Sequence, residues 1–309
     1  MTRRITPLNR SGPPAFATTA LAGACALMLG SQPLSAKPRS DFDAEVTASA
    51  VAASDRSVDE EGDYSRSGLI LRGSASYERR NGPTELRLEY DTGVYLYESD
   101  ERSNRWSNAV EVGLDQRMAQ DLHFGATVSY ASNIAVLEYR SADQSQVGGS
   151  IAYSPGDHRI TLSGGWRWRD YDNRDRTEGA GPFAELEYRL RLGRNRYVST
   201  EIGYEDIDSA DSRRGYERTT AQVLFQEPLS ANWRLRASVR ARQWTFDGRT
   251  APSGARRRDT SVRPVIELRR YWDNGLLLRG RAQYDFRSSN DPEFAGDEQQ
   301  VILTGGYRF

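Results

Sequence analysis

The amino-acid sequence predicts an all-β fold, a transmembrane antiparallel up-and-down β-barrel of about fourteen strands. Three observations lead to this prediction. Apolar residues recur at every second position. The connections between these segments are alternately short and long, and the chain begins with a targeting segment. Period-two alternation is typical of a strand whose two faces meet different environments, here lipid on one side and a polar interior on the other.

The overall composition resembles that of a soluble protein. The 309 residues carry a formal net charge of −1, 28% are charged, and the mean hydropathy is −0.72. This average is insensitive to barrels, because only half of the residues in a spanning strand face lipid. The near balance of opposite charges indicates no nucleic-acid partner.

Residues 1–36 are predicted to be a cleaved signal peptide. A basic start containing Arg3 and Arg4 precedes the apolar stretch 15–30, and small residues before Lys37 form a cleavage site at Ala36. The protein is therefore expected to be exported.

Cleavage at Ala36 divides the chain into three parts. After the signal peptide, residues 37–41 are predicted to form a short periplasmic segment, and residues 42–309 the barrel. The only cysteine, Cys25, lies in the signal peptide, so the mature chain is expected to contain neither a disulfide nor a thiolate metal site.

The alternating apolar residues define the predicted strands one by one. These segments are 42–50, 69–77, 86–90, 106–114, 122–130, 147–153, 160–168, 184–190, 198–204, 221–225, 233–241, 262–268, 276–284 and 301–309.

The connections alternate in length with equal regularity. Short turns are predicted at 80–83, 118–121, 155–157, 193–196, 227–232 and 272–275, where most carry residues suited to tight turns. Longer polar loops are predicted at 54–66, 98–104, 132–145, 170–181, 207–215, 247–258 and 287–297. Short turns at one end and long loops at the other are typical of membrane barrels. The apolar stretch 134–139 does not suit an exposed loop, and the sequence leaves open whether it extends the fifth strand or folds into the interior.

A soluble β-sandwich or solenoid, in which the same apolar face forms a dry core, is the competing interpretation of the alternation. Strands of soluble proteins average about 5–6 residues. Many of the predicted segments approach the ~9–11 residues that a tilted strand needs to cross a bilayer. Aromatic residues such as Tyr77, Trp106 and Trp233 also gather toward segment ends, where interfacial girdles would lie. Both observations favour the membrane barrel.

The last strand carries a further signal. Residues 300–309 alternate and end in Tyr307 and Phe309. In this, and in its signal peptide, the chain resembles bacterial outer-membrane porin-like β-barrels. The resemblance implies a location in the outer membrane, contact with outer-membrane lipid, and a C-terminal signal at Tyr307 and Phe309 for the barrel-assembly machinery.

The final hairpin, residues 284–309, is also similar to the end of the fourteen-stranded barrel in surface lipoprotein assembly modifiers. The sequence shows no counterpart of the N-terminal helical repeats of those proteins. The resemblance therefore does not imply a role in lipoprotein export.

The positions between the apolar residues are mostly charged, and no packed core could bury so many charges. We expect a water-filled lumen, since barrels of about eight strands are filled by side chains whereas those of about 16–18 strands hold aqueous channels. A basic wall is predicted from Arg234, Arg236, Arg240, Arg242, Arg263, Arg269, Arg279 and Arg281, and an acidic wall from Glu89, Asp91, Glu111 and Asp115.

The two walls would lie on opposite sides of a closed ring and set up a transverse electric field. An arginine wall would attract carboxylates and phosphates, because guanidinium binds both bidentately. The alternative is that the inward charges pair across neighbouring strands and give rigidity with little selectivity.

The predicted function is therefore a porin-like channel for passive passage of small hydrophilic solutes, with anions and saccharides as candidates. Two alternatives remain open. The barrel could belong to a system that exports or assembles an exopolysaccharide or a surface protein, or it could be a structural or adhesive barrel that acts through its loops.

An enzyme is not expected. His123 and His158 are the only histidines, so a serine–histidine or aspartate–histidine site would have to use one of them. No phosphate-binding loop, dinucleotide motif or zinc spacing is present. Catalytic residues, metal ligands and cofactors are therefore all predicted to be absent.

Overall fold

The computed structural model describes residues 39–54, 67–98, 104–137, 140–171 and 178–309. The predicted signal peptide, its cleavage site and Cys25 lie outside the described residues. The same holds for most of the first predicted loop, and for the cores of the loops predicted around residues 98–104 and 170–181.

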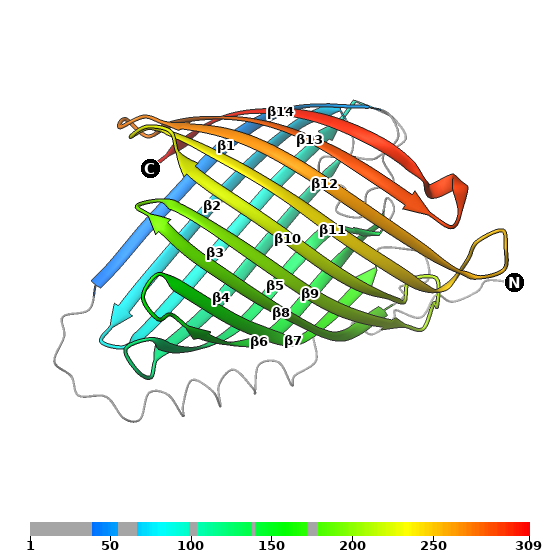
Figure 1. The fold of residues 1–309 in the computed structure, drawn as a ribbon, viewed down its shortest axis with the longest axis horizontal. Helices are drawn as coiled ribbons and strands as arrows, with labels where there is room; N and C mark the ends of the chain where they lie inside the picture. Colours follow the sequence, from blue (N-terminus) through cyan, green and yellow to red (C-terminus); the bar gives the residue numbers. More distant parts are fainter. Residues whose placement is uncertain (1–38, 55–66, 99–103, 138–139, 172–177) are drawn as a thin grey trace, which may run out of the picture. The chain divides into compact units, whose positions relative to one another are not determined.

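The described chain forms fourteen antiparallel strands that close into a barrel (Figure 1). The strands are β1 (Arg39–Ala53), β2 (Gly68–Asn81), β3 (Thr84–Tyr97), β4 (Arg105–Arg117), β5 (Leu122–Leu137), β6 (Arg140–Tyr153), β7 (His158–Tyr171), β8 (Glu178–Gly193), β9 (Arg196–Ser209), β10 (Tyr216–Pro228), β11 (Trp233–Thr250), β12 (Arg256–Tyr271), β13 (Leu276–Ser289) and β14 (Gly296–Arg308). The predicted apolar segments follow these strands in order, so the predicted fold class is confirmed.

Pairing of the first and last strands closes the barrel. Val46 of β1 lies opposite Tyr307 of β14, and Val51 lies opposite Ile302. Closure leaves no strand edge with unpaired backbone groups, which a bilayer interior does not tolerate. Tyr307 and Phe309 at the end of this seam project from the outer face, with ring centroids 4.8 Å apart. Their role as an assembly signal stays a prediction.

The barrel has two structurally different ends. Six short turns and both ends of the described chain lie at one end, here named the short-turn end, at the left of Figure 1. The opposite end, with the remaining connections, is named the loop end. Tight turning at the short-turn end uses left-handed backbone, as at Gly82 (φ 59°) and Asn195 (φ 62°). A 3-10 turn at Pro292–Phe294, the single helical element of the described residues, lies at the loop end between β13 and β14.

Several strands extend farther toward the loop end than the sequence predicts. The loop predicted at 132–145 is wrong, because β5 continues to Leu137 and β6 already begins at Arg140. Residues 134–137 thus extend the fifth strand, past a register shift beside Asn133. Lipid-facing apolar residues end where the bilayer ends, but strand pairing needs only backbone hydrogen bonds. The sequence pattern therefore stops before the strand does.

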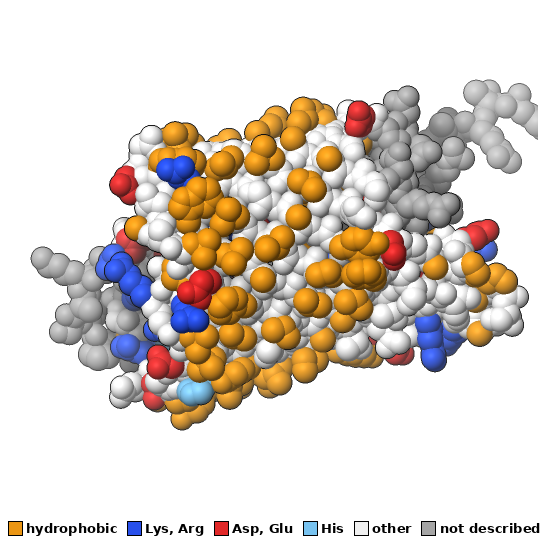
Figure 2. All heavy atoms as spheres, turned by 45° about the horizontal axis from the view of Figure 1, so that its top comes forward, with side chains coloured by type: hydrophobic (Ala, Val, Ile, Leu, Met, Phe, Trp, Pro, Cys, Tyr) orange, Lys and Arg blue, Asp and Glu red, His pale blue; other side chains and the backbone are white. Residues whose placement is uncertain are grey.

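The outer face carries a broad belt of exposed apolar side chains, and charged residues gather toward the two ends (Figure 2). Val46, Leu303 and Ile266 are each more than half exposed although they lie well inside their strands. Exposing such a surface to water would be unfavourable by about 25 cal/mol per Å² of apolar area, whereas exposing it to lipid would not. No helix of the described residues is long and apolar enough to span a membrane.

The two faces of β4 predict opposite responses to a new charge. Val110 lies on the outer face, and its neighbour Ala109 points inward, opposite Asp91. We expect Val110→Arg to destabilise the barrel by about 2–4 kcal/mol, as arginine does near a bilayer midplane. Ala109→Arg should change stability by less than about 1 kcal/mol, because the lumen is polar. Urea unfolding in lipid vesicles measures both. Equal losses would show that the apolar belt does not face lipid.

Candidate functional site

The inner face of the barrel holds the charged residues that the sequence analysis singled out. All eight arginines of the predicted basic wall occupy the alternation positions that face inward on β11, β12 and β13. The four predicted acids do so on β3 and β4. In the closed ring, β4 and β11 are separated by seven steps in either direction and lie across the lumen from each other.

The basic wall contains its own carboxylates. Glu267 of β12 lies opposite Arg236 on one neighbouring strand and opposite Arg281 on the other. Glu267 also accepts a hydrogen bond from Arg269. A single buried carboxylate thus compensates a group of arginines.

The other basic residues have partners of several kinds. Arg263 donates to Asp285 at 2.7 Å, and the guanidinium of Arg279 lies 3.7 Å from Glu45. Arg240 donates to Gln222, a neutral group, at 2.5 Å. Arg234 and Arg242 lie over the rings of Tyr271 and Trp244, at 5.2 and 6.0 Å from the centroids. The wall thus combines carboxylate, amide and aromatic contacts, and its eight arginines share β11 to β13 with the inward-facing carboxylates Asp259, Glu267 and Asp285.

The acidic wall also contains opposite charge. Glu89 and Glu111 lie directly opposite each other on β3 and β4. Arg87 compensates this like-charge pair from 3.2 and 3.7 Å. The carboxylate of Asp115 lies 2.9 Å from Nδ1 of His123. The side chains of Glu89 and Asp115 remain 41% and 42% exposed, so water reaches this side of the lumen.

A buried charge network joins β7, β9 and β10 toward the loop end. Glu205 is only 4% exposed. It accepts hydrogen bonds from Arg167 and, at 2.5 Å, from the Tyr216 hydroxyl. Arg218 and Arg169 approach the same carboxylate at 3.1 and 3.6 Å. Three arginines around one buried carboxylate make Glu205 the electrostatic centre of this part of the wall.

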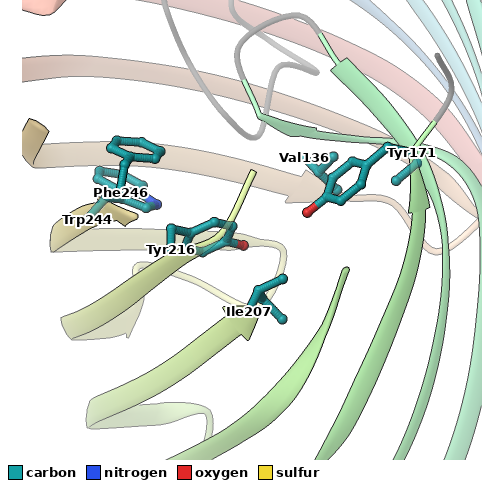
Figure 3. Close-up of a cluster of buried hydrophobic side chains, with 7 residues drawn as sticks. Val136, Tyr171, Ile207, Tyr216, Trp244 and Phe246 are labelled. Carbon is teal, nitrogen blue, oxygen red and sulfur yellow. The ribbon is translucent and has the colours of Figure 1, made fainter. Parts of the chain in front are cut away.

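A layer of apolar side chains lies inside the barrel beyond this network, here named the aromatic layer (Figure 3). It joins residues of β5, β6, β7, β9, β10 and β11, each less than a tenth exposed: Val136, Ala142, Tyr171, Ile207, Tyr216, Trp244 and Phe246. Inward-facing aromatic residues in an open aqueous channel would remain exposed. Their burial shows that side chains fill this part of the loop end.

Three cavities follow one another along the interior. One of about 440 Å³ lies at the short-turn end beside Arg87, Asp115 and His123. A recess of about 190 Å³ lies farther along, between Glu185, Glu205 and Arg240.

The third cavity, of about 490 Å³, opens at the loop end. Tyr171 of the aromatic layer forms part of its lining. On β11 the recess reaches Arg242 and the loop-end cavity begins at Gly248, with Trp244 and Phe246 between them. The aromatic layer therefore separates the recess from the loop-end cavity.

The apolar pattern of the sequence predicts neither the Glu205 network nor the aromatic layer. Glu205, Tyr216, Trp244 and Phe246 continue the inward-facing positions of their strands beyond the last lipid-facing apolar residues. Following the alternation beyond the lipid-facing apolar residues of each strand would have identified these four residues as inward-facing. Their mutual contact across β7 to β11 depends on barrel curvature, which alternation does not encode.

The two histidines occupy different environments. His123 forms the pair with Asp115, and within the described chain no serine or threonine hydroxyl hydrogen-bonds to its ring. His158 stacks on Tyr188 at the short-turn end, where its Nδ1 lies 2.8 Å from the phenol oxygen. Among the described residues, no group of three acidic, histidine or cysteine side chains could hold a metal ion. The absence of enzymatic activity stays a prediction.

Comparison with known proteins identifies the fold class. The chain has the fold of bacterial outer-membrane β-barrels. It is similar to the outer-membrane channel DcaP of Acinetobacter baumannii, with 11% identity, a TM-score of 0.54, and coverage of 88% of this chain and 97% of that one. It is also similar to the anion-selective porin of Comamonas acidovorans, with 8% identity, a TM-score of 0.50, and coverage of 88% and 100%.

A third similar structure is a bacterial polysaccharide outer-membrane secretin, with 12% identity, a TM-score of 0.52, and coverage of 87% of this chain and 98% of that one. No protein-family model matches the sequence, and no curated protein matches it. At these identities the likeness concerns the fold. It leaves the function and the solute unspecified.

The Glu205 network predicts an unequal effect of two carboxylate substitutions. Glu205→Gln would leave three arginines around a neutral, buried amide, and should reduce the free energy of unfolding by about 3 kcal/mol. Glu89→Gln is the same substitution at a carboxylate that water already solvates. It should change the free energy of unfolding by less than about 1 kcal/mol. Urea midpoints of the refolded variants provide the comparison. Equal midpoints would contradict a central role for Glu205.

Proposed function

We propose that the protein is an outer-membrane channel for passive passage of small hydrophilic solutes, with a preference for anions. The observation that carries the proposal is the polar interior of a closed barrel, which holds cavities lined by charged side chains and presents more inward-facing arginines than carboxylates on β11 to β13. Similar folds in an outer-membrane channel and in an anion-selective porin support it.

Anion preference follows from the chemistry of the lining. Arginine keeps its charge at any physiological pH and presents several donors in one plane. An anion moving along β11 would pass Arg234, Arg236, Arg240 and Arg242 in turn. Successive sites of moderate strength allow a solute both to enter and to leave, which conduction requires. The acids on β3 and β4, across the lumen, complete the proposed transverse field.

The aromatic layer is the proposed constriction. It lies between the recess and the loop-end cavity, and its residues come from strands on one side of the barrel. On the other side, Val51, Ile70, Tyr95 and Ile302 form a second buried apolar cluster near the loop end. Solutes that cross the barrel would pass between these two clusters, so their separation would set the size limit.

Export of a polymer or surface protein is the second candidate, and the similar fold of a polysaccharide secretin favours it over an adhesive barrel. An exporter would need the same interior but a partner at its short-turn end. Conductance of the isolated barrel discriminates the two, since a passive channel conducts alone.

Charge reversal in the basic wall should change ion selectivity. In planar bilayers under a salt gradient, the wild-type protein should give a reversal potential of anion-selective sign. Arg236→Glu with Arg240→Glu should move that potential toward cation selectivity, because both positions face the lumen.

The matched control for charge is Arg258→Glu on the outward-facing side of β12, which should leave the reversal potential unchanged. Stable conductance with no selectivity change in the double variant would contradict the proposed role of the basic wall. A folded barrel with no conductance at all would reject the passive channel in favour of export.

Shortening a side chain in the aromatic layer should widen the channel. Trp244 is 2% exposed inside the barrel, whereas Trp106 is exposed on the outer face. We expect Trp244→Ala to raise single-channel conductance about twofold or more, since conduction through a narrow pore is limited by its constriction. Trp106→Ala should leave conductance unchanged. An unchanged conductance in folded Trp244→Ala would place the constriction elsewhere.

A further inference from the structure

The cavity at the loop end has features of a built binding site. It encloses about 490 Å³, within the range of about 300–1,000 Å³ typical of small-molecule sites. Its walls come from the β9–β10 connection, the ends of β11 and β12, and the turn between β13 and β14. The site therefore lies beyond the aromatic layer, apart from the basic wall of the lumen.

Hydrogen bonds hold the cavity walls together. The backbone N–H of Gly248 donates to the carbonyl of Ser212 at 2.8 Å, and that of Asp247 donates to the carbonyl of Gly215 at 3.0 Å. Nε of Arg249 donates to the carbonyl of Arg213 at 2.7 Å. The β9–β10 connection is thereby fixed to β11, so the arginines of both segments keep defined positions around the cavity.

Positive charge exceeds negative charge around the cavity. Among the described residues, four arginines and two aspartates line it: Arg213, Arg214, Arg249, Arg257, Asp211 and Asp291. Arg257 is held from behind by buried Asp259, to which it donates at 2.6 Å. Counting that carboxylate as well, arginines still outnumber acids by one.

One donor of the cavity lining is buried without a partner. Nε of Arg214 donates to Asp211 at 3.2 Å, and the guanidinium lies 4.8 Å from the centre of the Tyr171 ring. Its Nη1 has no hydrogen-bond partner among the described residues and almost no exposed surface. A buried donor without an acceptor is unfavourable, and a bound oxyanion would supply the acceptor.

Aromatic rings hold a second arginine in a fixed orientation. The guanidinium of Arg257 lies between the rings of Phe246 and Phe294, 4.6 and 3.4 Å from their centroids. Stacking and the Asp259 contacts together restrict its rotation. A guanidinium with a fixed plane loses little entropy on binding a carboxylate or phosphate.

We propose that the loop-end cavity binds a soluble ligand that carries a carboxylate or phosphate group, with Arg213 and Arg214 as the principal contacts. This inference deepens the proposed function, since it places a selective binding step before the constriction. The aromatic layer, which contributes Tyr171 to the cavity, lies between this site and the lumen. Ligand binding here is independent of conduction and can be measured without it.

The test is calorimetric titration of the refolded full-length barrel in detergent with three probes: glucuronate, inorganic phosphate and glucose. We expect saturable binding of glucuronate and of phosphate, and none of glucose. The double variant Arg213→Gln/Arg214→Gln should weaken binding about tenfold or more, through the lost charge-assisted hydrogen bonds. Heat-dependent electrophoretic mobility verifies that each variant is folded.

The matched control is Arg256→Gln/Arg258→Gln, which removes the same charge from outward-facing positions of the same end of β12. Equal affinity for phosphate and glucuronate would identify the bare oxyanion as the ligand group, and tighter binding of glucuronate would identify an acidic sugar. Both outcomes support the site.

Three results would overturn the proposal: no saturable binding by the folded wild-type protein, equal weakening by the control double variant, or unchanged affinity in folded Arg213→Gln/Arg214→Gln. A barrel that conducts anions but fails to bind these probes rejects the loop-end site alone. A barrel that binds them without conducting rejects the passive channel and leaves the site intact.

Discussion

Closure of the sheet by the β1–β14 pair is the constraint on which the rest of this structure depends. A bilayer offers no hydrogen-bond partner to backbone groups, so a spanning sheet must pair every strand on both sides. Once the sheet is closed, its two faces become permanently different. Residues such as Val46 and Leu303 face outward, and their neighbours Thr47 and Thr304 face inward.

Because the charged side chains face inward, the second condition for a stable barrel is that each charge has an opposite charge near it. The structure meets it by surrounding single carboxylates with several arginines, as at Glu205, Glu267 and Asp259. Where two carboxylates meet, as Glu89 and Glu111 do, an arginine lies between them.

The sequence specified the strands well because lipid imposes a strict period of two on every crossing. It overestimated the loops, since β5, β7, β11 and β13 continue by backbone pairing after their lipid-facing residues end. The period-two alternation alone predicts that the arginines and acids of the two walls face inward. Partners such as Gln222 for Arg240, and the meeting of Tyr171, Tyr216 and Trp244, depend on strand stagger and barrel curvature. No single-strand pattern carries that information.

In the proposed channel, water fills the lumen as far as the aromatic layer and does not reach the buried side chains of the layer itself. Single cysteines, introduced with Cys25 replaced by serine, test this with a water-soluble maleimide on the folded barrel. Rapid labelling is expected at the inward positions 236, 238 and 240 of β11. Protection is expected at positions 237 and 239 on the lipid face and at Ala142→Cys, a small change at a residue that is 0% exposed in the layer. Rapid labelling of Ala142→Cys would contradict the buried layer, and protection at all inward positions would contradict a wet lumen.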